Sequence, residues 1–143
     1  MEVQQALLLK ERQGDLSNSR RRTIKAMSQQ VTIYHNPACS KSRETLELLR
    51  GRGGEPEIVE YLRTPPDAGR LGQLLDMLGM EAQQLLRTKE EEYTSLGLAG
   101  KLNDRVALIQ AMVEHPVLIE RPIVVSGNSA RLGRPPEDVL EIL

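Results

Sequence analysis

The stretch "VTIYHNPACSKSRETLELLR", residues 31–50, contains a strand-like run, a turn and a helix-like run. Its first five residues are mostly β-branched or aromatic, which is typical of a buried strand. Asn-Pro-Ala then turns the chain, and from Ser40 to Arg50 the leucines keep helical spacing. The sequence therefore predicts a strand over 31–35, a turn, and a helix over 40–50.

The segment after this helix predicts a second strand. "GRGGEP" ends the helix, because its glycines favour left-handed or loose backbone and Pro56 cannot continue a helix. "EIVEYL", residues 57–62, then has the composition of a strand. A strand, a helix and a second strand in this order form a right-handed crossover, so we expect the two strands to be parallel.

A helical region follows, over about residues 67–115. Its leucines and other apolar residues recur at helical spacing and no convincing strand interrupts them. Asn103 occupies a position where it could cap one of these helices. We therefore expect a helical insertion between the first crossover and the end of the chain.

The last part of the chain predicts a hairpin and a short helix. Gly127-Asn128 separates the strand-like runs "VLIERPIVVS" and "ARLGR", as in a β-hairpin. "PPEDVLEIL" has prolines and acidic residues at its start, as helices often do. The complete pattern predicts an α/β fold whose mixed sheet has about four strands.

Composition restricts the class of protein. The chain has 143 residues, 39% of them hydrophobic, which is enough for one domain with its own core. Only 2% are aromatic, and the net charge is −1, so neither base stacking nor overall charge favours nucleic acid or a membrane surface. The chain has no apolar run of membrane-spanning length and does not begin like a signal peptide, so we expect a cytoplasmic protein. Residues 1–30 are expected to form a polar, flexible extension, and residues 31–143 the domain.

The single cysteine, Cys39, lies between the turn and the helix start. Backbone N–H groups and the helix dipole there favour a thiolate, and they also favour bound oxyanions. Lys41, Arg43 and His35 are close in sequence and could add positive charge. Two alternatives remain open: Cys39 could be a small buried side chain, and His35 could be a structural histidine at a strand end. One cysteine and two histidines do not predict a metal site.

Two known cysteine architectures are absent. Thioredoxin-type motifs have a second cysteine three residues after the first, where this chain has Ser42. Cysteine phosphatases have an arginine six residues after the nucleophile, where this chain has Thr45. A lone reactive thiol must therefore pass its oxidised state to a thiol from outside the chain.

The chain resembles the glutaredoxin-dependent arsenate reductases, a family with a thioredoxin-like fold. The resemblance begins with "TIYHNPACSKSRETLELLR" and extends over residues 31–143. Further blocks in family order are "EYLRTPP", "LLRTKEEEY", "EHPVLIERPIVV" and "RLGRPPE". The resemblance implies a thioredoxin-like mixed sheet with the helical insertion.

The resemblance also implies roles for particular residues. Cys39 would be the nucleophile, and His35 the family histidine near the thiol. The arginines that bind the substrate oxyanion would be Arg87, Arg121 and Arg134. Supporting positions would be Ser42, Arg43 and Pro122, the last matching the proline that thioredoxin folds hold in cis opposite the cysteine.

The implied reaction reduces arsenate to arsenite through a covalent adduct on Cys39, with glutathione as co-substrate and a glutaredoxin as partner. No bound cofactor or metal is expected. Two other functions remain open. One is a glutathione-dependent thiol or disulfide reductase of the same fold. The other is a redox regulator that binds RNA polymerase, although Ser42 replaces the second cysteine such a switch typically uses.

Overall fold

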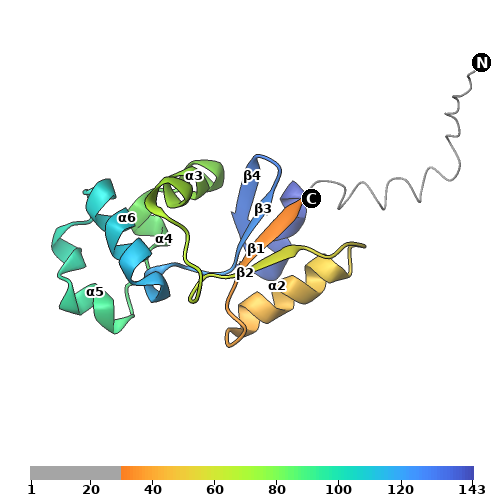
Figure 1. Ribbon diagram of the computed structural model, residues 1–143, viewed down its shortest axis with the longest axis horizontal. Helices are drawn as coiled ribbons and strands as arrows, with labels where there is room; N and C mark the ends of the chain where they lie inside the picture. Colours follow the sequence, from red (N-terminus) through yellow and green to blue (C-terminus); the bar gives the residue numbers. More distant parts are fainter. Residues whose placement is uncertain (1–29) are drawn as a thin grey trace, which may run out of the picture.

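The computed structural model describes residues 30–143 (Figure 1). The expected extension over residues 1–30 lies outside the described residues, apart from Gln30. The described part has a sheet with helices beside it, and a group of helices joined to the sheet by two connecting segments (Figure 1). Within residues 30–143 no helix is long and apolar enough to cross a membrane.

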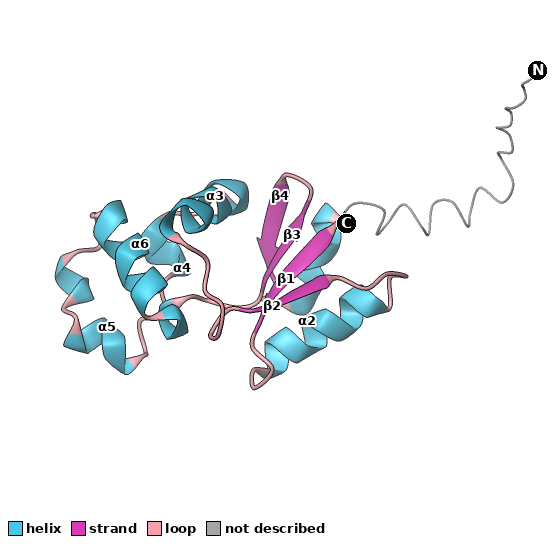
Figure 2. Cartoon of the chain, viewed as in Figure 1, coloured by secondary structure: helices cyan, strands magenta, loops and turns pink. Residues whose placement is uncertain are grey.

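The sheet has four strands within the described residues, in the order β2-β1-β3-β4 (Figure 2). The strands are β1 (Val31–His35), β2 (Glu57–Glu60), β3 (Ile123–Ser126) and β4 (Ser129–Leu132). β1 and β2 are parallel, whereas β3 is antiparallel to both β1 and β4. The predicted crossover, hairpin and mixed sheet are therefore confirmed, with two differences in length. The second strand ends at Glu60 rather than at residue 62, and the strand-like run 117–126 is a strand only over Ile123–Ser126.

Side chains along the strands divide the core into two clusters, one on each face of the sheet. Ile33 and Val124 belong to the cluster that contains Leu46 and Leu49 of α2 (Ser40–Arg50). Tyr34 belongs to the larger cluster, on the side of the helical insertion. Because neighbouring residues of a strand point to opposite faces, a short strand such as β1 serves both clusters.

The helical insertion lies between β2 and β3. It comprises α3 (Ala68–Leu78), α4 (Ala82–Leu85), α5 (Glu91–Ser95), α6 (Arg105–Glu114) and the 3₁₀ turns η2 (Leu98–Gly100) and η3 (Pro116–Leu118). Asp67 caps α3, its carboxylate accepting a hydrogen bond from Arg70 N at 2.8 Å. Asp104, not Asn103, caps α6 and accepts from Ala107 N at 3.0 Å. The expectation for Asn103 was wrong by one residue.

A short antiparallel pairing links the insertion to the segment that returns to the sheet. Leu86 and Ile119 form an isolated bridge, in which Arg87 N donates to Leu118 O at 2.8 Å and Glu120 N donates to Leu85 O at 2.9 Å. The expectation that residues 67–115 contain no strand gave no indication of this contact. Its consequence is that Arg87 lies alongside Glu120.

The C-terminal helix is a 3₁₀ helix, η4 (Pro136–Ile142), and not an α-helix. It packs against α2 and β4, and its Val139 is buried in the cluster with Leu49. The proline and acidic residues at its start do lie in the first turn, as predicted. Only the hydrogen-bonding pattern differs, which is common for short terminal helices.

Candidate functional site

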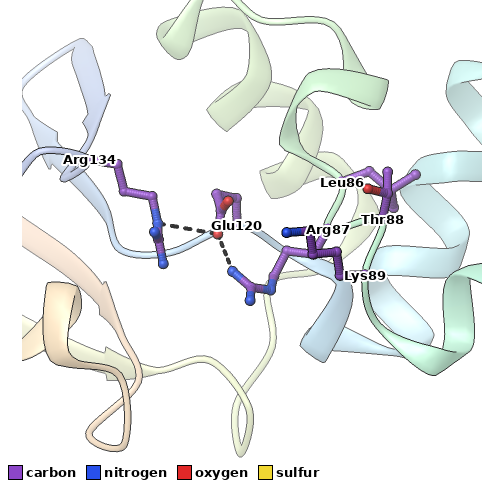
Figure 3. A pocket seen from close by; sticks show the side chains of 6 residues that line it. All are labelled: Leu86, Arg87, Thr88, Lys89, Glu120 and Arg134. Carbon is purple, nitrogen blue, oxygen red and sulfur yellow. Dashed lines mark hydrogen bonds and ion pairs between the residues drawn. The ribbon is translucent and has the colours of Figure 1, made fainter.

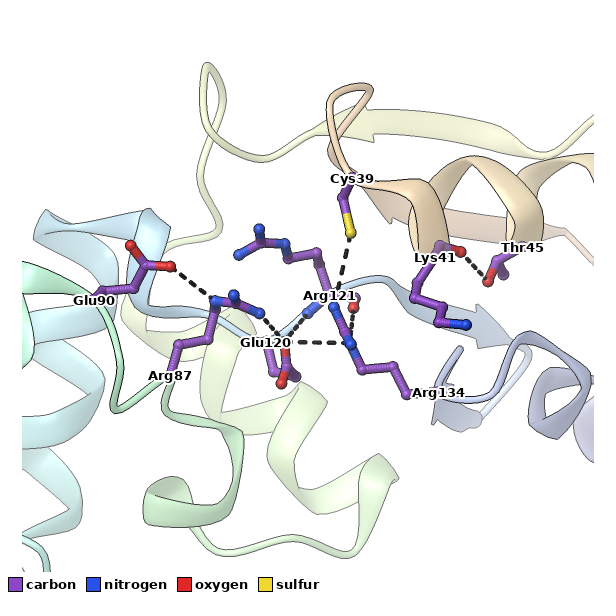
Figure 4. Close-up of polar contacts among 8 residues, drawn as sticks. All are labelled: Cys39, Lys41, Thr45, Arg87, Glu90, Glu120, Arg121 and Arg134. Carbon is purple, nitrogen blue, oxygen red and sulfur yellow. Dashed lines mark hydrogen bonds and ion pairs between the residues drawn. The ribbon is translucent and has the colours of Figure 1, made fainter.

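Cys39 is the N-cap residue of α2, with φ −98° and ψ 125°. Its N–H donates to Asn36 O at 3.0 Å, and its carbonyl accepts the first helical hydrogen bond, from Arg43 N at 3.0 Å. The thiol is partly exposed. Figure 4 shows it extending from the helix start toward the arginines. The alternative of a small buried cysteine side chain is therefore wrong.

The surroundings of Cys39 favour its thiolate. Partial burial alone would raise the pKa of the thiol. The backbone N–H of Ser42, the Arg121 side chain and the backbone N–H of Lys41 outweigh burial, so the pKa lies below its usual value. The helix start thus provides the backbone donors that the sequence predicted.

Arg134 and Arg121 lie next to the sulfur. Arg134 Nη2 donates to Cys39 Sγ at 3.7 Å, and Arg134 Nε donates to Arg121 O at 2.7 Å. The Arg121–Pro122 peptide bond is cis, as the resemblance implies, and Pro122 O accepts from Gly133 N at 3.0 Å. These hydrogen bonds place the segments before β3 and after β4 side by side next to the thiol.

Arg121 has unused hydrogen-bond donors. Its Nε and Nη1 are buried and have no hydrogen-bond partner within residues 30–143. In Figure 4 its side chain extends away from Arg134, into the space between Cys39 and Arg87. Buried donors without partners are costly and rare, and an anion held beside Arg121 would satisfy these atoms.

Arg87, the third predicted arginine, has no direct contact with Cys39 and reaches the site through a carboxylate. Its Nε donates to Glu90 Oε2 at 3.1 Å, and its Nη1 forms an ion pair with Glu120 Oε1. Glu120 Oε1 also lies 3.4 Å from Arg134 Nε. Glu120 therefore connects two of the three arginines (Figure 4).

Glu120 was not among the residues predicted from the sequence. It belongs to the quoted block "EHPVLIERPIVV" and directly precedes Arg121. An acidic residue next to a predicted oxyanion-binding arginine was the available signal. Its contact with Arg87 depends on the bridge between Leu86 and Ile119, which the sequence pattern did not predict.

A pocket of about 310 Å³ opens beside this ion-pair cluster (Figure 3). It is lined by Leu86, Arg87, Thr88, Lys89, Glu120 and Arg134. Its lining includes three basic side chains and one acidic side chain. The pocket can therefore admit an anionic molecule from solvent to the arginines.

His35 lies at the end of β1 with 6% of its surface exposed. Its Nδ1 is 2.6 Å from Ser42 Oγ, which also accepts a hydrogen bond from Asn36 N at 3.0 Å. Burial is the main reason that the pKa of His35 is lowered. The charge of Glu60 raises this pKa, and the charges of Arg50 and Arg43 lower it further. His35 is therefore neutral at neutral pH and connects the strand to the cysteine turn through Ser42.

Arg43 fixes the cysteine turn, and Gly133 lies where segments far apart in the sequence approach each other closely. Arg43 Nη1 donates to Pro37 O at 2.9 Å, so its guanidinium closes the turn rather than facing the sulfur. Gly133 packs so closely that an added Cβ would overlap Thr45 Oγ1 and lie 2.9 Å from Pro122 Cγ. Gly133 was not predicted from the sequence, because no local pattern marks a close approach between distant segments.

Among residues 30–143 no three histidine, cysteine, aspartate or glutamate side chains are grouped as a metal ion would require. The site is instead a partly exposed thiol at a helix start, two arginines next to it, and a third arginine joined to them through Glu120. This arrangement can hold a tetrahedral oxyanion next to a nucleophile.

Comparisons with known proteins agree with this geometry. Residues 34–142 match the ArsC family. The arsenate reductase of Escherichia coli (strain K12) is 50% identical over 113 residues, 79% of this chain and 80% of that protein. An uncharacterized protein of the same strain, YfgD, is 59% identical over 118 residues, 82% of this chain and 99% of that protein.

A solved structure shows the same fold. The arsenate reductase from Vibrio cholerae is 52% identical, and the match covers 80% of this chain and 98% of that chain with a TM-score of 0.78. The predicted thioredoxin-like fold and the family resemblance are therefore confirmed.

Proposed function

The chain belongs to the ArsC family, and we propose that it is an arsenate reductase whose nucleophile is Cys39. The observation that carries this proposal is the Cys39 thiol. It has a lowered pKa, lies 3.7 Å from Arg134 Nη2, and is next to the unpaired donors of Arg121. Relatives about 50% identical are arsenate reductases, which supports the substrate.

In the first step the Cys39 thiolate attacks the arsenic of bound arsenate. A sulfur–arsenic bond forms, and an arsenate oxygen leaves as hydroxide or water, with no change in oxidation state. Arg121 and Arg134 stabilise the remaining oxygens, because a guanidinium offers a fixed fork of donors to a tetrahedral oxyanion. Arg87 adds positive charge from the other side of Glu120.

Reduction from arsenic(V) to arsenic(III) needs two electrons, which two thiols provide when their sulfurs become a disulfide. Cys39 is the only cysteine of the chain, so the second thiol comes from outside. We assign this role to glutathione, which attacks the adduct and releases arsenite. The resulting disulfide between Cys39 and glutathione is reduced by a glutaredoxin, which regenerates the Cys39 thiolate.

The test of this function is arsenite formation by the purified protein with glutathione and a glutaredoxin present. Each thiol component is omitted in turn. We expect sustained turnover only with both present. If folded protein with a reactive Cys39 reduces glutathione mixed disulfides but not arsenate, the protein is a general thiol reductase, and the proposal is wrong.

A second experiment tests the oxyanion-binding role of Arg121. Replacing Arg121 by alanine removes its free donors, and we expect kcat/KM for arsenate to fall about 100-fold or more. Arg63→Ala is the control, because Arg63 is exposed and its ion pair is with Glu60, away from the thiol. Equal kinetics for the two variants would exclude Arg121 from the site.

A further inference from the structure

The Glu120 carboxylate lies among positive charges and donors that would otherwise attract an oxyanion. A single oxygen, Oε1, contacts Arg87 Nη1, Arg134 Nε at 3.4 Å and the backbone N–H of Arg121 at 3.2 Å. An oxygen of a bound tetrahedral anion would be satisfied by the same kind of donors. Figure 4 shows Glu120 between the Arg87 and Arg134 side chains.

The charges around the thiol are nearly balanced. The guanidiniums of Arg87 and Arg134 face the carboxylates of Glu120 and Glu90, whereas Arg121 contacts Glu120 through its backbone N–H. The Glu120 side chain is 26% exposed, and its partners Arg87 and Arg134 are 22% and 33% exposed. Partial burial reduces screening by solvent, so Glu120 offsets more of the attraction for an incoming anion than a surface carboxylate would.

Phosphate is the anion for which this balance matters most. Phosphate and arsenate have nearly the same charge and tetrahedral shape, so arginine forks bind both alike before reaction. Thiols reduce arsenate but not phosphate, so phosphate can only occupy the site. A site with three unopposed arginines would bind phosphate tightly and remain blocked.

We propose that Glu120 sets the anion affinity of the site: it weakens the binding of phosphate and arsenate before reaction and so limits how much of the site phosphate occupies. This inference rests on the proposed function, because it assigns the site to an oxyanion that reacts with Cys39. Arsenate loses the same ground-state affinity as phosphate, but it continues to a covalent bond with the thiol.

A purely structural role for Glu120 predicts the opposite effect. If Glu120 only held Arg87 and Arg134 in place, its replacement would loosen both arginines and weaken anion binding. The glutamine variant Glu120→Gln separates the two roles, because glutamine keeps the size and an acceptor oxygen but removes the charge. Misfolding also cannot produce a gain in affinity.

The experiment measures inorganic phosphate binding to the full chain by calorimetry, at fixed pH and ionic strength. We expect Glu120→Gln to lower the dissociation constant for phosphate about tenfold, because one nearby negative charge is removed. Glu141→Gln is the control. It also removes one charge, but from an exposed carboxylate that pairs with Arg131, so its dissociation constant should match that of the wild type.

The inference is overturned if Glu120→Gln binds phosphate no more tightly than the wild type, or if neither protein binds phosphate. It is also overturned if Glu141→Gln gives the same gain. Phosphate binding needs no thiol chemistry, so the result is independent of turnover. If Glu120→Gln binds phosphate more tightly but the wild type fails to reduce arsenate, the role of Glu120 is supported and the reductase proposal is contradicted.

Discussion

At the scale of single residues, the reactivity of Cys39 follows from its position at the start of α2. The backbone N–H groups of Ser42 and Lys41 and the charge of Arg121 favour the thiolate, against the effect of burial. The sequence predicted the backbone part of this effect, because the turn and helix are adjacent in the chain. It assigned Arg121 only through the family resemblance.

The first prediction concerns the pH dependence of Cys39 alkylation. Only the thiolate reacts, so the rate with iodoacetamide rises with pH and levels off above the pKa. Because this pKa is lowered, we expect the midpoint below that of glutathione measured under the same conditions. A midpoint at or above that of glutathione would contradict the account of the thiol.

The second prediction concerns His35 and stability. The pKa of His35 is lowered chiefly by burial, so below a pH of about 6.5 the unfolded chain binds more protons than the folded protein. This residue therefore contributes stability that is present above that pH and is lost as the pH falls. His35→Asn keeps a polar atom near Ser42 but does not titrate.

Chemical denaturation of both proteins between about pH 5 and pH 7.5 provides the measurement, because this range spans the ordinary histidine pKa. We expect the wild type to be the more stable protein at the higher pH and the difference in unfolding free energy to narrow as the pH falls. A difference that stays constant across this range would show that His35 does not titrate as described.

At the scale of elements, the site depends on contacts between segments far apart in the sequence. The segment after β4 approaches α2 and the residue before β3 at Gly133, which has no room for a side chain. This contact holds Arg134 next to Cys39. No local sequence pattern marks such an approach, because Gly133 is neither at a turn nor at a positive φ.

The third prediction follows from this packing. Gly133→Ala would place a methyl group against Thr45 and Pro122, so we expect a loss of about 1–3 kcal/mol in the free energy of unfolding. Gly100→Ala is the control, because nothing lies within 4 Å of the added Cβ. If denaturant unfolding gives equal stabilities for the two variants, the close approach at Gly133 is not a constraint.

At the scale of the whole molecule, sequence periodicity predicted the order of elements and the mixed sheet. Each strand and helix has its own local pattern, and the connections are short. Predictions failed where tertiary contacts decide the outcome. The bridge between Leu86 and Ile119 and the role of Glu120 both depend on the insertion meeting the segment that returns to the sheet. Arg87, Arg121 and Arg134 come from three separate segments of the sequence, and only the resemblance to the family blocks identified them together.

The central claim, that Cys39 attacks arsenate, is tested most directly by intact mass spectrometry without glutaredoxin. The protein is incubated anaerobically with arsenate and reduced glutathione. The account predicts that one glutathione becomes attached to Cys39, that attachment requires arsenate, and that Cys39→Ser shows none. Attachment at the same rate without arsenate, or its persistence in Cys39→Ser, would contradict the claim.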